Sequence, residues 1–97
     1  MNYEKAIRST LVTLVEFYAS WCPDCRRMLP AVDRLREEFR GRVDVHRFEI
    51  DNQQALADKE NVQHIPLFIV YREGKEMWRE SGVMDYEYLK SHIVEYL

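Results

Sequence analysis

The sequence has no long apolar run and no strong excess of charge of either sign. None of its hydrophobic segments approaches the roughly 18 residues needed to span a bilayer. The first residues, "MNYEKAIRST", lack the apolar core of a signal peptide. The net charge is −3, which argues against nucleic acid or an anionic membrane as a partner. We therefore expect a cytoplasmic protein whose partners are neither nucleic acids nor membranes.

Cysteine is scarce: the chain holds two, Cys22 and Cys25, separated by Pro23 and Asp24. In a cytoplasmic protein, such a pair is more often redox-active or metal-binding than a structural disulfide. A structural zinc site needs about four ligands, an iron–sulfur cluster normally has about four thiolates, and the chain has no second pair. Covalent haem attachment needs a histidine where Arg26 stands. A redox pair without metal or cofactor is favoured, and a buried pair without chemistry remains the alternative.

The length predicts one domain over residues 1–97. Apolar runs predict strands at 11–19, 43–50 and 67–72, and a turn at "EG", 73–74, returns the chain as a fourth strand, 75–81. Helical spacing predicts helices at 3–9, 23–39, 52–59 and 85–97. The last helix would begin at Asp85 as N-cap and bury Tyr88, Leu89, Ile93 and Tyr96. A helical crossover makes the first two strands parallel, and the last two form an antiparallel hairpin.

The cysteine pair follows a predicted strand and begins a predicted helix. Residues three apart on one helical turn have Cβ atoms roughly 5–6 Å apart, so a small adjustment permits a disulfide. The free amides and the dipole of the helix start favour a thiolate at Cys22, which we expect to be the attacking nucleophile. Cys25, one turn further in, would be more buried and would resolve the mixed disulfide.

Charged neighbours adjust this pair. Arg26 and Arg27 add positive charge, while Asp24 places a carboxylate beside the reduced, anionic form of Cys22. That carboxylate disfavours the reduced form and makes the disulfide harder to reduce. On this ground we predict a reducing rather than an oxidising protein.

The sequence resembles the thioredoxin family in "VEFYASWCPDC", in Pro30 of the following helix, in "FEID" and "HIP", and in Gly74 and Gly82. The resemblance covers roughly residues 10–97. It implies an α/β thioredoxin fold: a four-stranded mixed sheet in the order 43–50, 11–18, 67–72, 75–81, with helices on both faces. It also implies a thiol–disulfide oxidoreductase that reduces protein disulfides and is recycled by a reductase such as a thioredoxin reductase. The rivals are a reductase serving one partner and a thioredoxin-like binding module with little general activity.

The resemblance also implies the roles of particular residues. Pro66 would be a cis-proline facing the cysteines, and Ile65 would present its backbone to a substrate polypeptide. Trp21 would flank the pair and shape the contact surface, which Pro23 and Asp24 would complete. The alternative for Trp21 is an ordinary surface aromatic.

Two further residues come from the resemblance, and a third, His64, from its position two residues before Pro66. Glu16 stands where the family often has a buried aspartate, and would take the proton of the resolving thiol. Burial would raise its pKa, although Arg47, at a position where the family often has lysine, could pair with Glu16 and hold it anionic. The alternative is that Glu16 reaches solvent at the sheet edge. His64 would lie near Cys22, where a protonated imidazole stabilises a thiolate, or would be a solvated loop residue.

The sequence departs from the family pattern at three points. The dipeptide between the cysteines is Pro-Asp where thioredoxins usually have Gly-Pro, and Leu67 replaces a common threonine, which makes the substrate groove more apolar. The family's usual N-terminal strand is apparently absent. Strand 43–50 would then be an edge, whose charges discourage edge-to-edge pairing. We expect a monomer, with dimerisation along this edge as the competing outcome.

Overall fold

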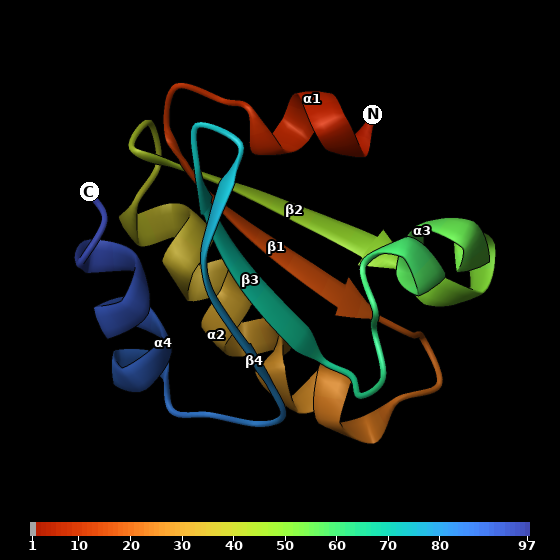
Figure 1. Ribbon diagram of the computed structural model, residues 1–97. Coiled ribbons are helices and arrows are strands. Elements are labelled where there is room, and N and C mark those ends of the chain that lie inside the picture. The colour runs from red at the N-terminus through yellow and green to blue at the C-terminus, as the bar shows by residue number, and fades with distance from the viewer. Residues whose placement is uncertain (1) are drawn as a thin grey trace.

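The computed structural model describes residues 2–97, in which the main helices and strands follow one another in the predicted order (Figure 1). The elements are α1 (Tyr3–Ile7), β1 (Val12–Tyr18), α2 (Pro23–Glu38), β2 (Val43–Glu49), the 3-10 helix η1 (Ile50–Asn52), α3 (Gln54–Lys59), β3 (Leu67–Arg72), β4 (Lys75–Ser81) and α4 (Tyr86–Val94). The first and last helices are shorter than predicted, and η1 precedes α3 where one helix was expected. No helix within residues 2–97 is both long enough and apolar enough to cross a membrane.

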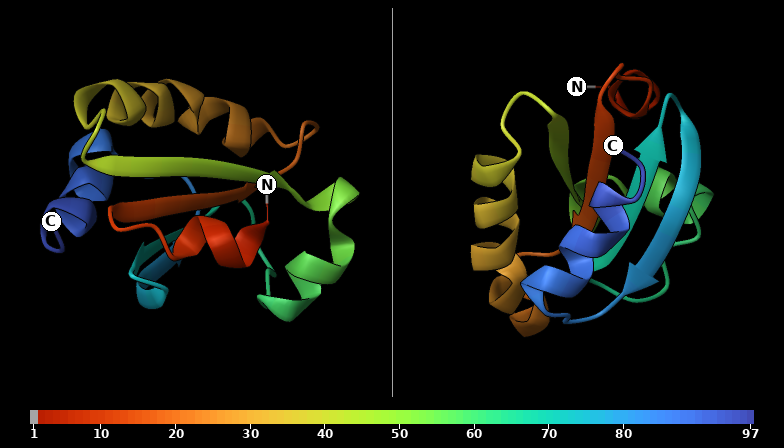
Figure 2. Two further views of the ribbon diagram at one scale, coloured as in Figure 1. Left: turned by 90° about the horizontal axis from the view of Figure 1, so that it is seen from above. Right: turned by 90° about the vertical axis from the view of Figure 1, so that its left-hand side faces the viewer.

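The four strands form one mixed sheet in the order β2-β1-β3-β4. β1 is parallel to β2 and antiparallel to β3, and β3 and β4 form an antiparallel hairpin. The predicted strand order and directions are therefore confirmed. Figure 2 shows α1 and α3 on one side of the sheet and α2 on the other. β2 lies at an edge of the sheet, as expected.

Two cores flank the sheet, because successive side chains of a strand point to opposite faces. Toward α2 and α4, the core contains Val12, Leu14, Met28, Val32, Leu35, Phe39, Val43, Phe68, Val70, Leu89 and Ile93. Toward α1, it contains Tyr3, Ala6, Ile7, Val15, Phe17, Phe48, Leu67, Ile69 and Tyr71. β1 contributes to both, which explains why it is apolar on both faces. The end of this doubly buried strand leads directly to the cysteine pair.

The β3–β4 turn is formed by Glu73 (φ 51°) and Gly74 (φ 85°). Two successive positive φ angles are the requirement of a type I′ turn, whose twist matches that of a two-strand hairpin. The amide of Gly74 donates to the carbonyl oxygen of Ile7 at 2.9 Å. The hairpin tip is thereby attached to the end of α1.

One prediction about α4 is wrong. Tyr88 was expected on the buried face but is 43% exposed, whereas Leu89 and Ile93 are fully buried. Tyr88 lies beside the buried stripe, and its hydroxyl donates to Glu80 at the surface. Asp85 occupies the N-cap position, but its side chain makes no capping hydrogen bond.

Candidate functional site

The cysteine pair lies on the first turn of α2. Cys22 is the N-cap residue, with extended backbone angles, and its Sγ accepts a hydrogen bond from the amide of Cys25 at 3.1 Å. Pro23 takes the first helical position, where its missing N–H would have had no helical partner. Both cysteines are buried free thiols. The predicted placement of the two sulfurs on one helical turn is confirmed.

Cys25 lies behind Cys22, with only 1% of its surface exposed. Burial raises the pKa of the Cys25 thiol to about 12, and the neighbouring Cys22 and Glu16 push it in the same direction. A hydrogen bond with the Ala19 backbone opposes part of that rise. Cys25 therefore holds its proton at neutral pH and needs a base before it can act as a nucleophile.

The loop between α3 and β3 packs against the cysteines from the other side. The Ile65–Pro66 peptide bond is cis, and Pro66 is buried. The Sγ atom of Cys22 lies 4.0 Å from the carbonyl oxygen of Ile65. Ile65 also packs on the small apolar cluster that contains both cysteines. The sequence motif "HIP" and the distant cysteine pair are thus brought together in space.

Two exposed apolar side chains lie on segments that adjoin the cysteine pair or the Pro66 loop. Trp21 is 61% exposed, and its indole N–H donates to Asp51 at 2.9 Å, which fixes the ring at the surface. Val83, which is 52% exposed, follows Gly82, whose amide donates to the carbonyl oxygen of Pro66 at 2.8 Å. The sequence analysis missed Val83, and its position next to the matched glycine was the available signal.

The remaining predicted contact residues lie on α2 and on the loop before β3. Pro23 is exposed, and Asp24 is half-buried and accepts a hydrogen bond from Arg27 at 2.8 Å. His64 is exposed on the loop before Pro66. Its carbonyl oxygen accepts a hydrogen bond from Ser81 at 3.1 Å, which ties this part of the loop to the end of β4.

Glu16 is fully buried in the middle of β1. Its Oε1 accepts a hydrogen bond from Nε of Arg47 at 2.8 Å, so the predicted pairing is confirmed. Its Oε2 has no hydrogen-bond partner within residues 2–97. Burial raises the pKa of the Glu16 carboxyl, and Arg47 offsets only part of that rise. The alternative in which Glu16 reaches solvent at the sheet edge is wrong, and burial outweighs the effect expected of Arg47.

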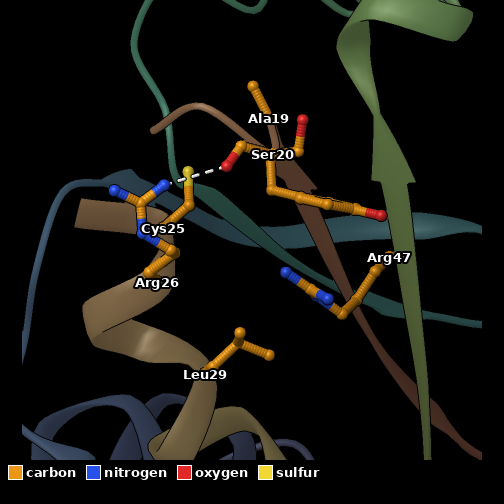
Figure 3. Close-up of a pocket in the computed structure, with 7 residues that line it drawn as sticks. Ala19, Ser20, Cys25, Arg26, Leu29 and Arg47 are labelled. Carbon is orange, nitrogen blue, oxygen red and sulfur yellow. Dashed lines mark hydrogen bonds between the residues drawn. The ribbon is translucent and has the colours of Figure 1, made fainter. Parts of the chain in front are cut away.

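A pocket of about 250 Å³ opens beside Cys25, lined by Tyr18, Ala19, Ser20, Cys25, Arg26, Leu29 and Arg47 (Figure 3). Cys25 from α2 and Arg47 from β2 lie on opposite sides of it. Arg26 donates to the carbonyl oxygen of Ser20 at 2.9 Å, and the Arg47 guanidinium lies 3.8 Å from the centre of the Tyr18 ring. Within the part of the chain that the structure describes, no three metal-ligating side chains gather at one point.

Known proteins resemble this chain in both sequence and fold. The model of the thioredoxin family matches residues 1–95. A thioredoxin from Chlamydia pneumoniae is 35% identical over 92 residues, which cover 95% of this chain and 88% of the relative. Thioredoxin 1 from Chlorobaculum tepidum is 31% identical over 87 residues, covering 90% of this chain and 86% of the relative. The structure of a mutant thioredoxin from Halobacterium salinarum matches with a TM-score of 0.87 at 29% identity, covering 96% of this chain and 80% of that one.

Proposed function

The chain belongs to the thioredoxin family and is a thiol–disulfide oxidoreductase, and from this premise we propose that it reduces protein disulfides through Cys22 and Cys25. The observation that carries the proposal is the arrangement of the two sulfurs. The Sγ of Cys22 caps α2 and faces the Ile65 carbonyl, while Cys25 lies one turn deeper with a raised pKa. On this basis we assign the attack on the substrate disulfide to Cys22 and the resolution of the mixed disulfide to Cys25.

In the first step, the thiolate of Cys22 attacks one sulfur of the substrate disulfide. A new S–S bond forms between Cys22 and the substrate, and the second substrate sulfur leaves as a thiolate that takes a proton from water. The amide of Cys25, 3.1 Å from the Cys22 sulfur, supports the anionic form of the nucleophile before attack.

In the second step, Cys25 must lose its proton although its pKa is about 12. Glu16 is the base, because it is buried near Cys25 and burial raises the pKa of its carboxyl above the ordinary range, which makes its carboxylate a stronger proton acceptor. The Cys25 thiolate then attacks Cys22, releases the second substrate sulfur and closes the internal disulfide. Two electrons pass from the dithiol to the substrate.

The substrate polypeptide binds along the rim of the pair. The backbone of Ile65 beside Pro66 pairs with it, and the exposed ring of Trp21 provides apolar contact. Pro23 and Asp24, which separate the two cysteines along the chain, complete the contact surface. His64, exposed on the same loop, adds a polar contact beside Ile65.

Thioredoxins act on disulfide-containing substrates, are recycled by a reductase and need no cofactor beyond the dithiol. For this chain we propose disulfide-containing proteins as substrates and a separate reductase, such as a thioredoxin reductase, as the electron donor. We further propose a monomer of one domain that works in the cytoplasm.

Insulin reduction driven by dithiothreitol tests the proposal. Cys22→Ser should abolish the acceleration over dithiothreitol alone, and Cys25→Ser should accumulate a mixed disulfide that a gel without reductant detects. In Glu16→Gln, which keeps both cysteines, the mixed disulfide between Cys22 and the substrate should live roughly 10-fold longer or more than in the wild type. Equal rates for the wild type and Cys22→Ser would favour the binding module instead.

A further inference from the structure

β4 holds the 60–66 loop, which joins α3 to β3, by two side chains on one face of the strand. Arg79 donates from Nη1 to the carbonyl oxygen of Glu60 at 2.7 Å. Ser81 donates from Oγ to the carbonyl oxygen of His64 at 3.1 Å. Both acceptors are backbone atoms, so these two side chains fix the path of the loop itself.

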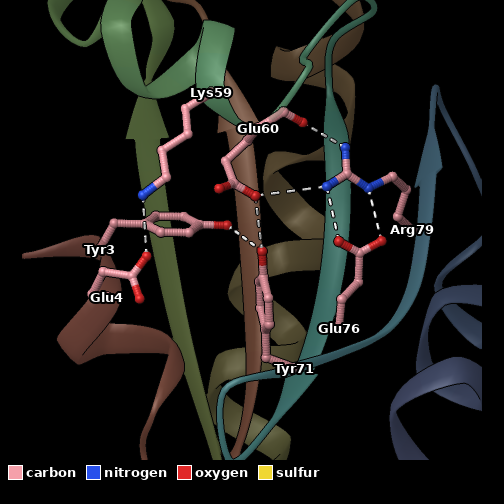
Figure 4. A network of polar contacts seen from close by, with 7 residues as sticks. All are labelled: Tyr3, Glu4, Lys59, Glu60, Tyr71, Glu76 and Arg79. Atoms are coloured by element: carbon pink, nitrogen blue, oxygen red, sulfur yellow. Dashed lines mark hydrogen bonds and ion pairs between the residues drawn. The ribbon is translucent and has the colours of Figure 1, made fainter.

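The guanidinium of Arg79 is held in one orientation (Figure 4). Its Nε and Nη2 donate to the two carboxylate oxygens of Glu76, each at 2.9 Å. Nη2 also lies 3.7 Å from the Glu60 carboxylate. A planar guanidinium with a bidentate partner is a rigid donor, which a lysine could not reproduce.

The Glu60 side chain is fixed from its other side as well. The hydroxyl of Tyr71 donates to Oε1 of Glu60 at 3.3 Å, and the hydroxyls of Tyr71 and Tyr3 lie 2.6 Å apart. Both tyrosines are buried. The start of the 60–66 loop is therefore attached to α1, β3 and β4 together, and the loop cannot shift as a unit without breaking these bonds.

We propose that Arg79 and Ser81 are positioning residues for disulfide exchange: they hold the 60–66 loop so that the Ile65 backbone meets a polypeptide substrate above Cys22. Ile65 lies between the His64 carbonyl that Ser81 holds and Pro66, and its own carbonyl oxygen is 4.0 Å from the Cys22 sulfur. This inference rests on the proposed function, in which the Ile65 backbone binds the substrate. A displaced loop would misalign that backbone while leaving the cysteines on α2 in place.

Two disulfides of different size separate this role from a general structural one. A polypeptide disulfide needs the loop for binding, whereas a small aromatic disulfide such as dithiobis-nitrobenzoate needs only access to Cys22. Loosening the loop should therefore slow the polypeptide reaction and spare the small one. A defect in the cysteines or in folding would slow both.

The experiment measures single-turnover oxidation of the reduced protein by each disulfide, as a function of disulfide concentration. Arg79→Met should lower the second-order rate constant with insulin about tenfold. The loss should come from a higher insulin concentration at half-saturation, with the limiting rate unchanged. Ser81→Ala should lower this rate constant about threefold. Arg79→Lys should be nearly as slow with insulin as Arg79→Met. The rate with dithiobis-nitrobenzoate should stay at the wild-type value. Arg34→Met, on the exposed side of α2, is the matched control and should change neither rate.

Equal losses with both disulfides, or no loss with insulin in either variant, would overturn the proposal. Ser81→Ala keeps it testable if Arg79→Met does not fold, because Ser81 is exposed and contributes one hydrogen bond. The proposed function fails separately, if the wild type reacts with neither disulfide faster than Cys22→Ser does.

Discussion

The Nε atom of Arg47 lies 2.8 Å from Oε1 of Glu16, yet the second oxygen of that fully buried carboxyl has no partner within residues 2–97. Only one of the two carboxyl oxygens of Glu16 therefore takes part in the ion pair with Arg47. Because burial outweighs the pull of Arg47, the pKa of Glu16 is raised above its ordinary value of 4.5. Folding and ionisation of this group oppose one another.

Replacing Glu16 by glutamine should make the protein more stable at alkaline pH. A group whose pKa is raised on folding contributes fully below its unfolded pKa, and that contribution is lost as the pH rises through the folded pKa. Urea unfolding at pH 8 should show Glu16→Gln more stable than the wild type by on the order of 1 kcal/mol. The difference should disappear below the unfolded pKa of 4.5, where the glutamate, like the glutamine, is neutral in both the folded and the unfolded chain. Glu37→Gln, at an exposed position, is the control, and a Glu16→Gln protein that is less stable at every pH would contradict this account.

The alkylation of Cys25 should follow its raised pKa. In Cys22→Ser, burial still acts on Cys25, and it is the largest cause of the rise to about 12. The rate of reaction with iodoacetamide should therefore keep increasing above pH 9 in the folded protein. In urea the rate should level off near the ordinary pKa of 9.0. Matching profiles in the folded and unfolded chain would show that burial does not control this thiol.

The charge of Asp24 should tune the redox potential. Asp24→Asn removes a negative charge from the first turn of α2 and frees Arg27, its partner at 2.8 Å. Both changes stabilise the reduced, anionic form, so the protein should become less reducing, by on the order of 10 mV. Titration against glutathione measures the shift. Asp33→Asn, later in the same helix, should leave the potential unchanged, and a more reducing Asp24→Asn protein would refute the electrostatic argument.

The two buried tyrosine hydroxyls should differ in what their loss costs. Tyr3→Phe removes one hydrogen bond, but Tyr71 keeps Glu60 as its acceptor, so the free energy of unfolding should fall by about 1 kcal/mol. Tyr71→Phe leaves the hydroxyl of Tyr3 buried without a partner and should cost about 2 kcal/mol. Urea unfolding gives both values, with the exposed Tyr88→Phe as control. The reverse order would mean that Tyr3, not Tyr71, is the central member of the network.

The sequence predicted most of the sheet, because period-two and continuous apolar runs carry strand identity directly. It predicted the start of α2 as well, since a proline after Cys22 and the spacing of Met28, Val32 and Leu35 are local signals. The network around Arg79 could not be predicted, because its members come from α1, the 60–66 loop, β3 and β4 and share no local pattern.

The burial of Tyr88 was predicted wrongly for a similar reason. Helical spacing places Tyr88 beside the buried stripe of Leu89 and Ile93, but spacing alone does not fix how far the helix is rotated about its axis. That rotation is set by packing against the sheet, and it brings the Tyr88 hydroxyl to Glu80. For Glu16, the family pattern located the residue, but whether its Oε2 finds a partner among residues 2–97 depends on three-dimensional packing that the sequence does not show.

The sulfur of Cys22 is both the redox-active atom and the cap of α2, because it accepts the hydrogen bond from the Cys25 amide. The oxidation state of Cys22 therefore affects how easily the first turn of the helix opens. A thiolate is a stronger acceptor than a sulfur in a disulfide. Oxidation to the disulfide therefore weakens the hydrogen bond that caps the first turn of α2, and reduction strengthens it again. The exchange rate of the Cys25 amide with deuterated solvent thus becomes a gauge of oxidation state that needs no added probe.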